Sequence, residues 1–132
     1  MTDSTPPTVD LAIRGGLLFD AASGSLTPGD VLVHDGVIIA LGADAPATAA
    51  HDTIDATGTI VSPGLVDMHV HIFRGQDLGL DAGLIGPRAG TTTFVDTGSA
   101  GAHLWEAFHH VTAQLPQRVR AFINIATIGT TS

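Results

Sequence analysis

The sequence contains no cysteine and no lysine, and its five basic residues are all arginines. Without cysteine, the chain can form neither a disulfide nor a thiolate zinc site. Without lysine, it can form neither a P-loop nor a Schiff base. Because 13 acidic residues outnumber the five arginines, the formal net charge is −8. Nucleic acids and anionic membranes bind basic surfaces, so the sequence argues against both as partners.

Long hydrophobic runs are also absent. Nowhere do about 18 apolar residues follow one another, and the first residues form neither a basic nor an apolar leader segment. We therefore expect a soluble, cytoplasmic protein. The content of 44% hydrophobic and 14% charged residues is typical of a globular chain. Its 132 residues suffice for one modest domain with a core.

The first half of the chain predicts a small all-β subdomain over residues 9–62, after a disordered lead-in over residues 1–8 that is rich in Thr, Ser and Pro. Short β-strand patterns alternate here with turn residues. The clearest turn is Asp35-Gly36, which lies between apolar runs at residues 31–33 and 37–39. This pattern predicts a tight hairpin whose turn residues have positive φ.

The second half, residues 63–132, predicts strands that alternate with helices. We expect strands at residues 65–72, 91–96 and 119–126, a short helix or turn at 78–86, and a helix at 100–115 that Ser99 caps and Pro116 ends. Such alternation indicates a parallel sheet with crossover helices. The third strand leaves a sheet edge that nothing in the sequence covers, so the pattern indicates the front part of a larger structure.

The strand at residues 65–72 carries Asp67, His69 and His71 at every second position. A β-strand sends alternate side chains to the same face, so these three are predicted to converge while the apolar residues between them pack on the opposite face. Imidazole and carboxylate groups are ligands of Zn²⁺ and related ions. A solvated polar face is the alternative interpretation. The metal site is favoured because unpaired polar groups on an otherwise buried strand are costly, and Asp67 is a candidate either for a ligand or for a residue that supports the histidines.

Residues 61–71 (VSPGLVDMHVH), which follow IDATG at residues 54–58, resemble the amidohydrolase superfamily of metal-dependent hydrolases. The resemblance implies an α/β fold, with a small N-terminal β-sandwich-like subdomain followed by the first three strands of an incomplete TIM (β/α)₈ barrel. Residues 90–101 (GTTTFVDTGSAG) resemble the dihydroorotase-like deacetylase branch, which removes N-acetyl groups. Dihydroorotases themselves usually have arginine two residues after the second histidine. Phe73 at that position argues against pyrimidine ring opening.

The same resemblance implies that His69 and His71 bind the more buried metal of a site with one or two divalent ions, expected to be Zn²⁺. It places Gly98 and Ser99 in a loop beside the substrate, expected to be a small N-acyl compound. The family's carboxylated lysine, later histidines and general-base aspartate cannot be placed in this chain, so no catalytic residue is identified. We expect hydrolysis of an amide or ester acyl bond by metal-activated water, and no activity of these 132 residues alone.

Two other hypotheses remain open. The uncovered edge at residues 119–126 favours a non-catalytic metal-binding or subunit protein that a second copy or another chain completes. Residues 97–101 (TGSAG) approximate the G-x-S-x-G motif of serine hydrolases, with Ser99 as nucleophile. The acid and the histidines that follow Ser99 all lie on the predicted helix 100–115, which argues against this third hypothesis.

Overall fold

The computed structural model describes residues 8–74, 76 and 78–130, so the lead-in predicted for residues 1–8 lies almost wholly outside the described residues. The chain divides into two compact units, Met1–Pro63 and Gly64–Ser132, which are called unit 1 and unit 2 below. Among the described residues, no helix has the length and apolar character that crossing a membrane requires.

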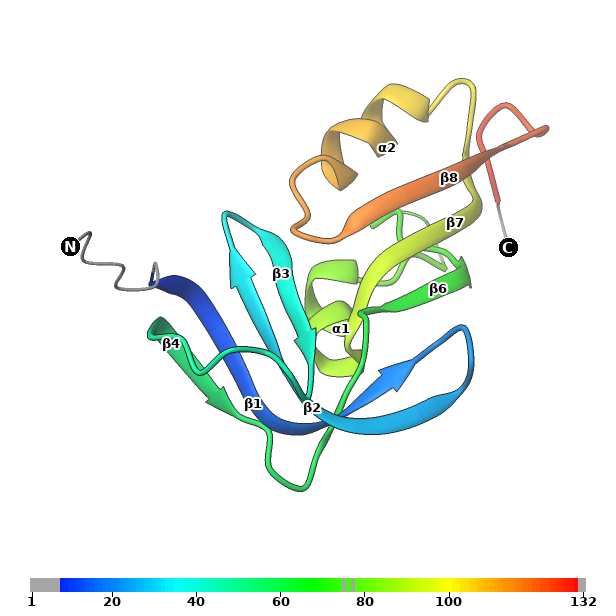
Figure 1. Cartoon of the computed structure of the whole chain (residues 1–132). Coiled ribbons are helices and arrows are strands. Elements are labelled where there is room, and N and C mark those ends of the chain that lie inside the picture. Colours follow the sequence, from blue (N-terminus) through cyan, green and yellow to red (C-terminus); the bar gives the residue numbers. More distant parts are fainter. Residues whose placement is uncertain (1–7, 75, 77, 131–132) are drawn as a thin grey trace. The chain divides into compact units, whose positions relative to one another are not determined.

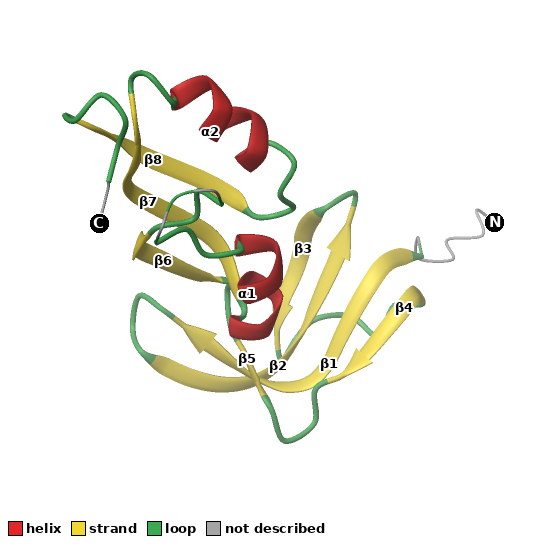
Figure 2. Cartoon of the chain, turned by 180° about the vertical axis from the view of Figure 1, so that it is seen from behind, coloured by secondary structure: helices red, strands yellow, loops and turns green. Residues whose placement is uncertain are grey.

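Among its described residues, unit 1 contains strands only, in one mixed sheet with the order β3-β2-β1-β4 (Figure 1). Strand β5, labelled in Figure 2, also pairs with β1. Strand β2 is antiparallel to β1 and β3, whereas β4 and β5 run parallel to β1. The strands are β1 (Val9–Asp20), β2 (Ser25–His34), β3 (Val37–Gly42), β4 (Ala50–Asp55) and β5 (Ile60–Val61).

The β2–β3 hairpin confirms the turn predicted at Asp35-Gly36. His34 pairs with Val37, and the two turn residues have φ of 50° and 72°. Both central residues of a type I′ turn need positive φ, which asparagine, aspartate and glycine tolerate best. Local chemistry therefore fixes this hairpin.

Strand β1 is one continuous element, although Gly15 and Gly16, which are typical turn residues, lie within it. The register with β2 shifts between Ile13 and Gly16, and Gly15 has φ of 72°. The glycines thus form a β-bulge instead of a turn, which bends the strand without ending it. As a result, the first half of β1 pairs with β4 and the second half with β5.

Unit 2 contains a parallel sheet in the order β6-β7-β8, as the sequence predicted (Figure 2). Its helices contribute Ala82 and Phe108 to one buried cluster, which also contains Ile72 and Phe94 from the sheet side. The elements follow one another along the chain as β6 (Leu65–Val70), α1 (Ala82–Ala89), β7 (Thr91–Gly101), α2 (Trp105–Thr112) and β8 (Arg118–Asn124).

The helix predicted at residues 100–115 is shorter than expected, and the predicted Ser99 cap is wrong. Strand β7 continues to Gly101, which pairs with Asn124, and α2 begins only after Leu104, whose side chain makes no capping hydrogen bond. A Cβ atom at position 101 would lie 1.9 Å from the carbonyl oxygen of Ala126. Glycine there allows the backbones to approach closely, and this extends the strand past residue 100, where the helix was predicted to begin.

The strand that carries the histidines packs only partly as predicted. Val70 and Ile72 are buried in the core of unit 2, but Val66 and Met68 are exposed, Met68 to 75%. At the opposite side of the sheet, Phe122 on β8 is exposed as well. Within the described residues, β6 and β8 each pair with β7 alone, so both edges of this sheet are uncovered.

Candidate metal centre

The predicted ligands lie at the carboxyl end of β6. His69 is exposed and His71 half-buried, and their ring centroids are 6.0 Å apart in an edge-to-face arrangement. Asp67 is turned toward its own strand, where Oδ1 accepts a hydrogen bond of 3.1 Å from the backbone N–H of His69. The three residues do not bring ligand atoms within 4.8 Å of one another. The structure therefore brings the two histidines together and gives Asp67 a backbone contact.

His71 follows the last residue of β6 and is held by Ser99, which is 28 residues away in the sequence. The two side chains meet at a distance of 3.0 Å between Nδ1 and Oγ. The other ring nitrogen, Nε2, makes no hydrogen bond to any described residue. An imidazole held through one nitrogen with the other left open fits the chemistry of a metal ligand.

Asp96 is fully buried and bonds the backbone next to both members of this pair. Its Oδ2 accepts a hydrogen bond of 2.9 Å from the backbone N–H of Ile72. Its Oδ1 accepts bonds of 2.7 Å and 3.1 Å from the backbone N–H groups of Ser99 and Gly98. One carboxylate thus joins the segment that carries His71 to the segment that carries Ser99.

Gly98 and Ser99, which were predicted to lie in a loop beside the substrate, belong to β7 and are buried in this structure. Ser99 is 1% exposed, and Gly98 adopts φ of 99° with its carbonyl oxygen accepting bonds from Asn124 Nδ2 and Thr130 Oγ1, at 2.9 Å and 2.8 Å. These contacts fix this end of β7 from the β8 side. The hydroxyl of Ser99 therefore meets His71 rather than open solvent.

Ser99 and His71 also resemble two members of a serine-hydrolase triad, in a pairing that the sequence did not suggest because His71 precedes the serine. In such triads the acid accepts a hydrogen bond from the imidazole and orients it. Asp96 instead bonds only backbone N–H groups. With the hydroxyl buried and no acid on the ring, the geometry argues against a nucleophilic serine.

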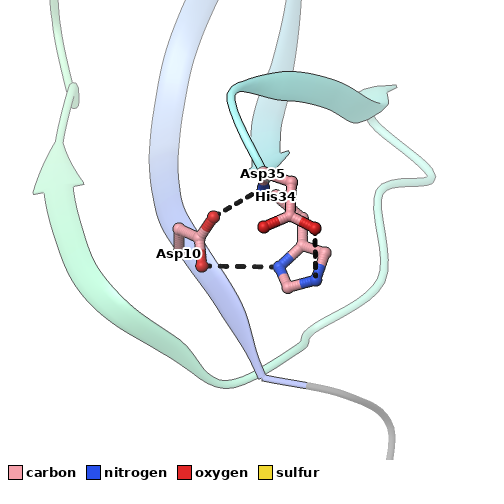
Figure 3. Close-up of side chains that lie close together, drawn as sticks. All are labelled: Asp10, His34 and Asp35. Carbon is pink, nitrogen blue, oxygen red and sulfur yellow. Dashed lines mark hydrogen bonds and ion pairs between the residues drawn. The ribbon is translucent and has the colours of Figure 1, made fainter.

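A second cluster of metal-ligating side chains lies in unit 1, where Asp10, His34 and Asp35 converge (Figure 3). Within the part of the chain that the structure describes, it is the one group of three whose ligand atoms lie within 4.8 Å of one another. The Asp10 carboxylate accepts a bond of 2.6 Å from the Asp35 backbone N–H and lies 3.4 Å from His34 Nδ1. All three are partly or largely exposed, so these contacts describe a surface network around the hairpin turn.

Sequence reasoning missed this second cluster because its members come from β1, from the end of β2 and from the turn that follows β2. The antiparallel register of β1 with β2, which pairs Leu11 with Val33, brings Asp10 beside His34. The structure also has a cavity of 410 Å³ between α2 and β8, lined among others by Trp105 and Gln117. None of the predicted ligands lines that cavity.

Comparison with known proteins finds relatives among hydrolases and deaminases, whereas no family model matches the chain. A deacetylase of Agrobacterium fabrum is 40% identical over 103 residues, which are 76% of this chain and 25% of the relative. A dihydroorotase of Citrifermentans bemidjiense is 44% identical over 73 residues, which are 55% of this chain and 16% of the relative. The chain thus spans a quarter or less of the length of these curated relatives.

Solved structures agree with these sequence matches. An adenine deaminase has a TM-score of 0.79 and 29% sequence identity, covering 94% of this chain and 33% of its own. The N-acyl-D-glutamate deacylase of Bordetella bronchiseptica, complexed with zinc and a phosphonate inhibitor, has a TM-score of 0.68 and 25% identity. That match covers 91% of this chain and 30% of the deacylase.

Proposed function

Because the chain belongs to the amidohydrolase superfamily and corresponds to part of its fold, we propose that it contributes two histidine ligands to the metal centre of a deacetylase-like hydrolase. The observation that carries the proposal is the pair His69 and His71 at the carboxyl end of β6, with His71 held through Nδ1 and its Nε2 open. In barrels of parallel strands, the carboxyl ends of the strands carry the active site.

The proposed reaction is hydrolysis of an N-acyl bond, as the name of the 40% identical deacetylase suggests. Zn²⁺ is the proposed metal, since the deacylase neighbour is complexed with zinc. A divalent metal in such a centre polarises the carbonyl and lowers the pKa of bound water toward about 7. The role of this chain is to supply two imidazoles on a rigid strand end. Catalytic zinc normally has three protein ligands, so these 132 residues alone are proposed to be inactive.

The ligand proposal can be tested by titrating the chain with Zn²⁺ in competition with a chelating dye at neutral pH. We expect the double variant His69→Ala/His71→Ala to lose at least about tenfold in affinity, since ligands contribute more than the groups that support them. The matched control is His103→Ala/His109→Ala, which removes two exposed histidines from the same unit and is expected to bind as the parent chain does. Unchanged affinity in the first double variant would contradict the ligand assignment.

The activity proposal is tested separately, with N-acetyl amino acids and Zn²⁺. We expect the isolated chain to give no turnover above that of the His69→Ala/His71→Ala variant. Metal-dependent turnover by the isolated chain would contradict its proposed inactivity. Turnover that survives a chelator and disappears in Ser99→Ala would instead support a serine hydrolase.

A second candidate function follows from the two uncovered edges of the unit 2 sheet. Exposed Met68 on β6 and exposed Phe122 on β8 favour a chain that pairs with further strands, either in another protein or in a second copy. Size-exclusion chromatography with light scattering tests this proposal. A monodisperse monomer at micromolar concentration would argue against self-association, whereas a stable dimer would support it.

A further inference from the structure

We propose that Ser99 is a positioning residue for His71, and that Asp96 places Ser99 where it can act. In this arrangement, Nδ1–H of His71 donates to the Ser99 hydroxyl oxygen, which would leave the lone pair of Nε2 available to bind a metal. The inference rests on the proposed function, because it presumes that His71 is a ligand. It goes further by assigning a role to a serine that the sequence presented as a helix cap, a substrate-loop residue or a nucleophile.

The first support is the contact itself. Ser99 Oγ lies 3.0 Å from His71 Nδ1, and the serine is 1% exposed, so water competes little for this hydrogen bond. Neutral imidazole carries one proton, which resides on either nitrogen. A hydroxyl can accept as well as donate, so a metal on Nε2 requires the proton on Nδ1 and makes Ser99 the acceptor.

The second support is the backbone around the pair. Parallel pairing of β6 with β7 sets Val70 opposite Asp96, so the residues that follow Val70 and those that follow Asp96 within β7 lie side by side. Asp96 then bonds the N–H of Ile72, next to His71, and the N–H of Ser99 itself. Charge-assisted hydrogen bonds to a buried carboxylate are strong, so the separation of the two side chains is fixed by a rigid brace.

The third support is the rigidity of the end of β7 on the side that faces β8. The carbonyl oxygen of Gly98 accepts hydrogen bonds from Asn124 and Thr130, and a Cβ atom at position 129 would lie 2.1 Å from the Ser99 carbonyl oxygen. Strand β8 and the segment after it therefore pack closely against Gly98 and Ser99 and hold them. A residue that orients a ligand needs this kind of support, because small displacements weaken a metal site.

The experiment measures Zn²⁺ affinity and the His71 tautomer in the 132-residue chain. Ser99→Ala removes only the hydroxyl, and we expect Zn²⁺ to bind roughly tenfold more weakly. Nitrogen chemical shifts of the His71 ring in the metal-free parent chain should report the proton on Nδ1, and the population of that tautomer should fall in Ser99→Ala. Ser99→Thr keeps a hydroxyl and should restore part of both signals.

The matched control is Thr112→Val, which removes another buried hydroxyl of unit 2, bonded to the Phe108 carbonyl oxygen at 2.9 Å. It should lower stability without changing Zn²⁺ affinity or the tautomer. If Ser99→Ala binds Zn²⁺ as the parent does while the His69→Ala/His71→Ala variant does not, the positioning role is overturned and the proposed ligands stand. If that double variant also binds Zn²⁺ as the parent does, the ligand assignment in the proposed function is contradicted, and the positioning role that rests on it is overturned as well. A ring proton on Nε2 in the parent chain would likewise overturn the inference.

Discussion

The two units use aspartate side chains in opposite ways. In unit 2, Asp96 is fully buried and bonds three backbone N–H groups, and the structure gives it no cationic partner among the described residues. In unit 1, Asp30 is partly exposed and pairs with Arg14, Nη1 to Oδ2, at 2.7 Å. Asp10 is more exposed still and bonds the hairpin turn.

The difference shows which hydrogen bonds contribute strongly to stability, those of a buried carboxylate, and which contribute little, those of an exposed one. Removal of a buried carboxylate leaves the N–H groups that it accepted from desolvated and without an acceptor. Water takes the place of an exposed carboxylate that is removed. The His71 region should therefore respond to mutation far more than the His34 region, although both histidines have carboxylates nearby.

The largest effect is expected from Asp96→Ala. The variant leaves the buried N–H groups of Ile72, Gly98 and Ser99 without their acceptor, at about 1 to 3 kcal/mol for each unsatisfied group. We expect unit 2 to lose at least about 3 kcal/mol in free energy of unfolding. The single tryptophan, Trp105, lies in unit 2 and reports its unfolding in urea by fluorescence. A loss below about 1 kcal/mol would mean that water reaches these groups.

A smaller effect is expected from Arg14→Ala in unit 1. The guanidinium bonds Asp30 and also donates to the carbonyl oxygens of Pro46 and Thr48, so it ties β1 to β2 and to the segment before β4. At about 1 kcal/mol net per hydrogen bond, with part of that replaced by water, we expect a loss of about 1 to 2 kcal/mol. Amide hydrogen exchange of β1 and β2 measures it, and exchange in β7 should stay unchanged as the internal control.

Acid should weaken unit 1 through the same pair. The Arg14 hydrogen bond, with a further bond from the Gly15 backbone N–H, holds the pKa of Asp30 below its usual value. Because the folded pKa lies below the unfolded value of about 3.9, the stabilisation is fully present above about pH 4. It is lost as the pH falls through the folded pKa. Asp30→Asn should lower the stability of unit 1 at neutral pH and should make its stability fall less steeply as the pH decreases. Amide hydrogen exchange between pH 3 and 6 measures both effects. An unchanged acid profile would count against this pair as its source.

The smallest effect is expected from Asp10→Asn and from His34→Ala. Exposed ion pairs contribute about 0 to 1 kcal/mol, so unit 1 should lose less than about 1 kcal/mol in either variant. Zn²⁺ affinity, measured by dye competition, should not change in His34→Ala. Tenfold weaker Zn²⁺ binding by that variant would indicate that the metal site lies in unit 1, and it would contradict the expectation that the His71 region responds more to mutation than the His34 region.

Local sequence patterns were enough to predict much of this fold. The Asp35-Gly36 hairpin follows from turn residues that tolerate positive φ, and the parallel β6-β7-β8 order follows from alternating strands and helices. The superfamily was recognisable from residues 61–71, and the relatives agree with it. The assignment of His69 and His71 as ligands stays a prediction.

Other features could not be predicted, because they depend on which residues different strands bring together. The bulge at Gly15 keeps β1 continuous through a pair of glycines, and the close approach of Gly101 to Ala126 extends β7 into the start of the helix predicted at residues 100–115. Asp67 also meets a backbone N–H of its own strand, a choice of side-chain conformation that alternation along a strand does not specify.

The sequence by itself determined that two imidazoles stand two residues apart at the end of an apolar strand, because that spacing is written into a single segment. Only the tertiary structure decided what holds them. The register between β6 and β7 brings Asp96 and Ser99 to His71 from more than twenty residues away. Such contacts follow from the pairing of strands that are distant in the sequence, and that register depends on the apolar faces that both strands bury together, so no single segment specifies it.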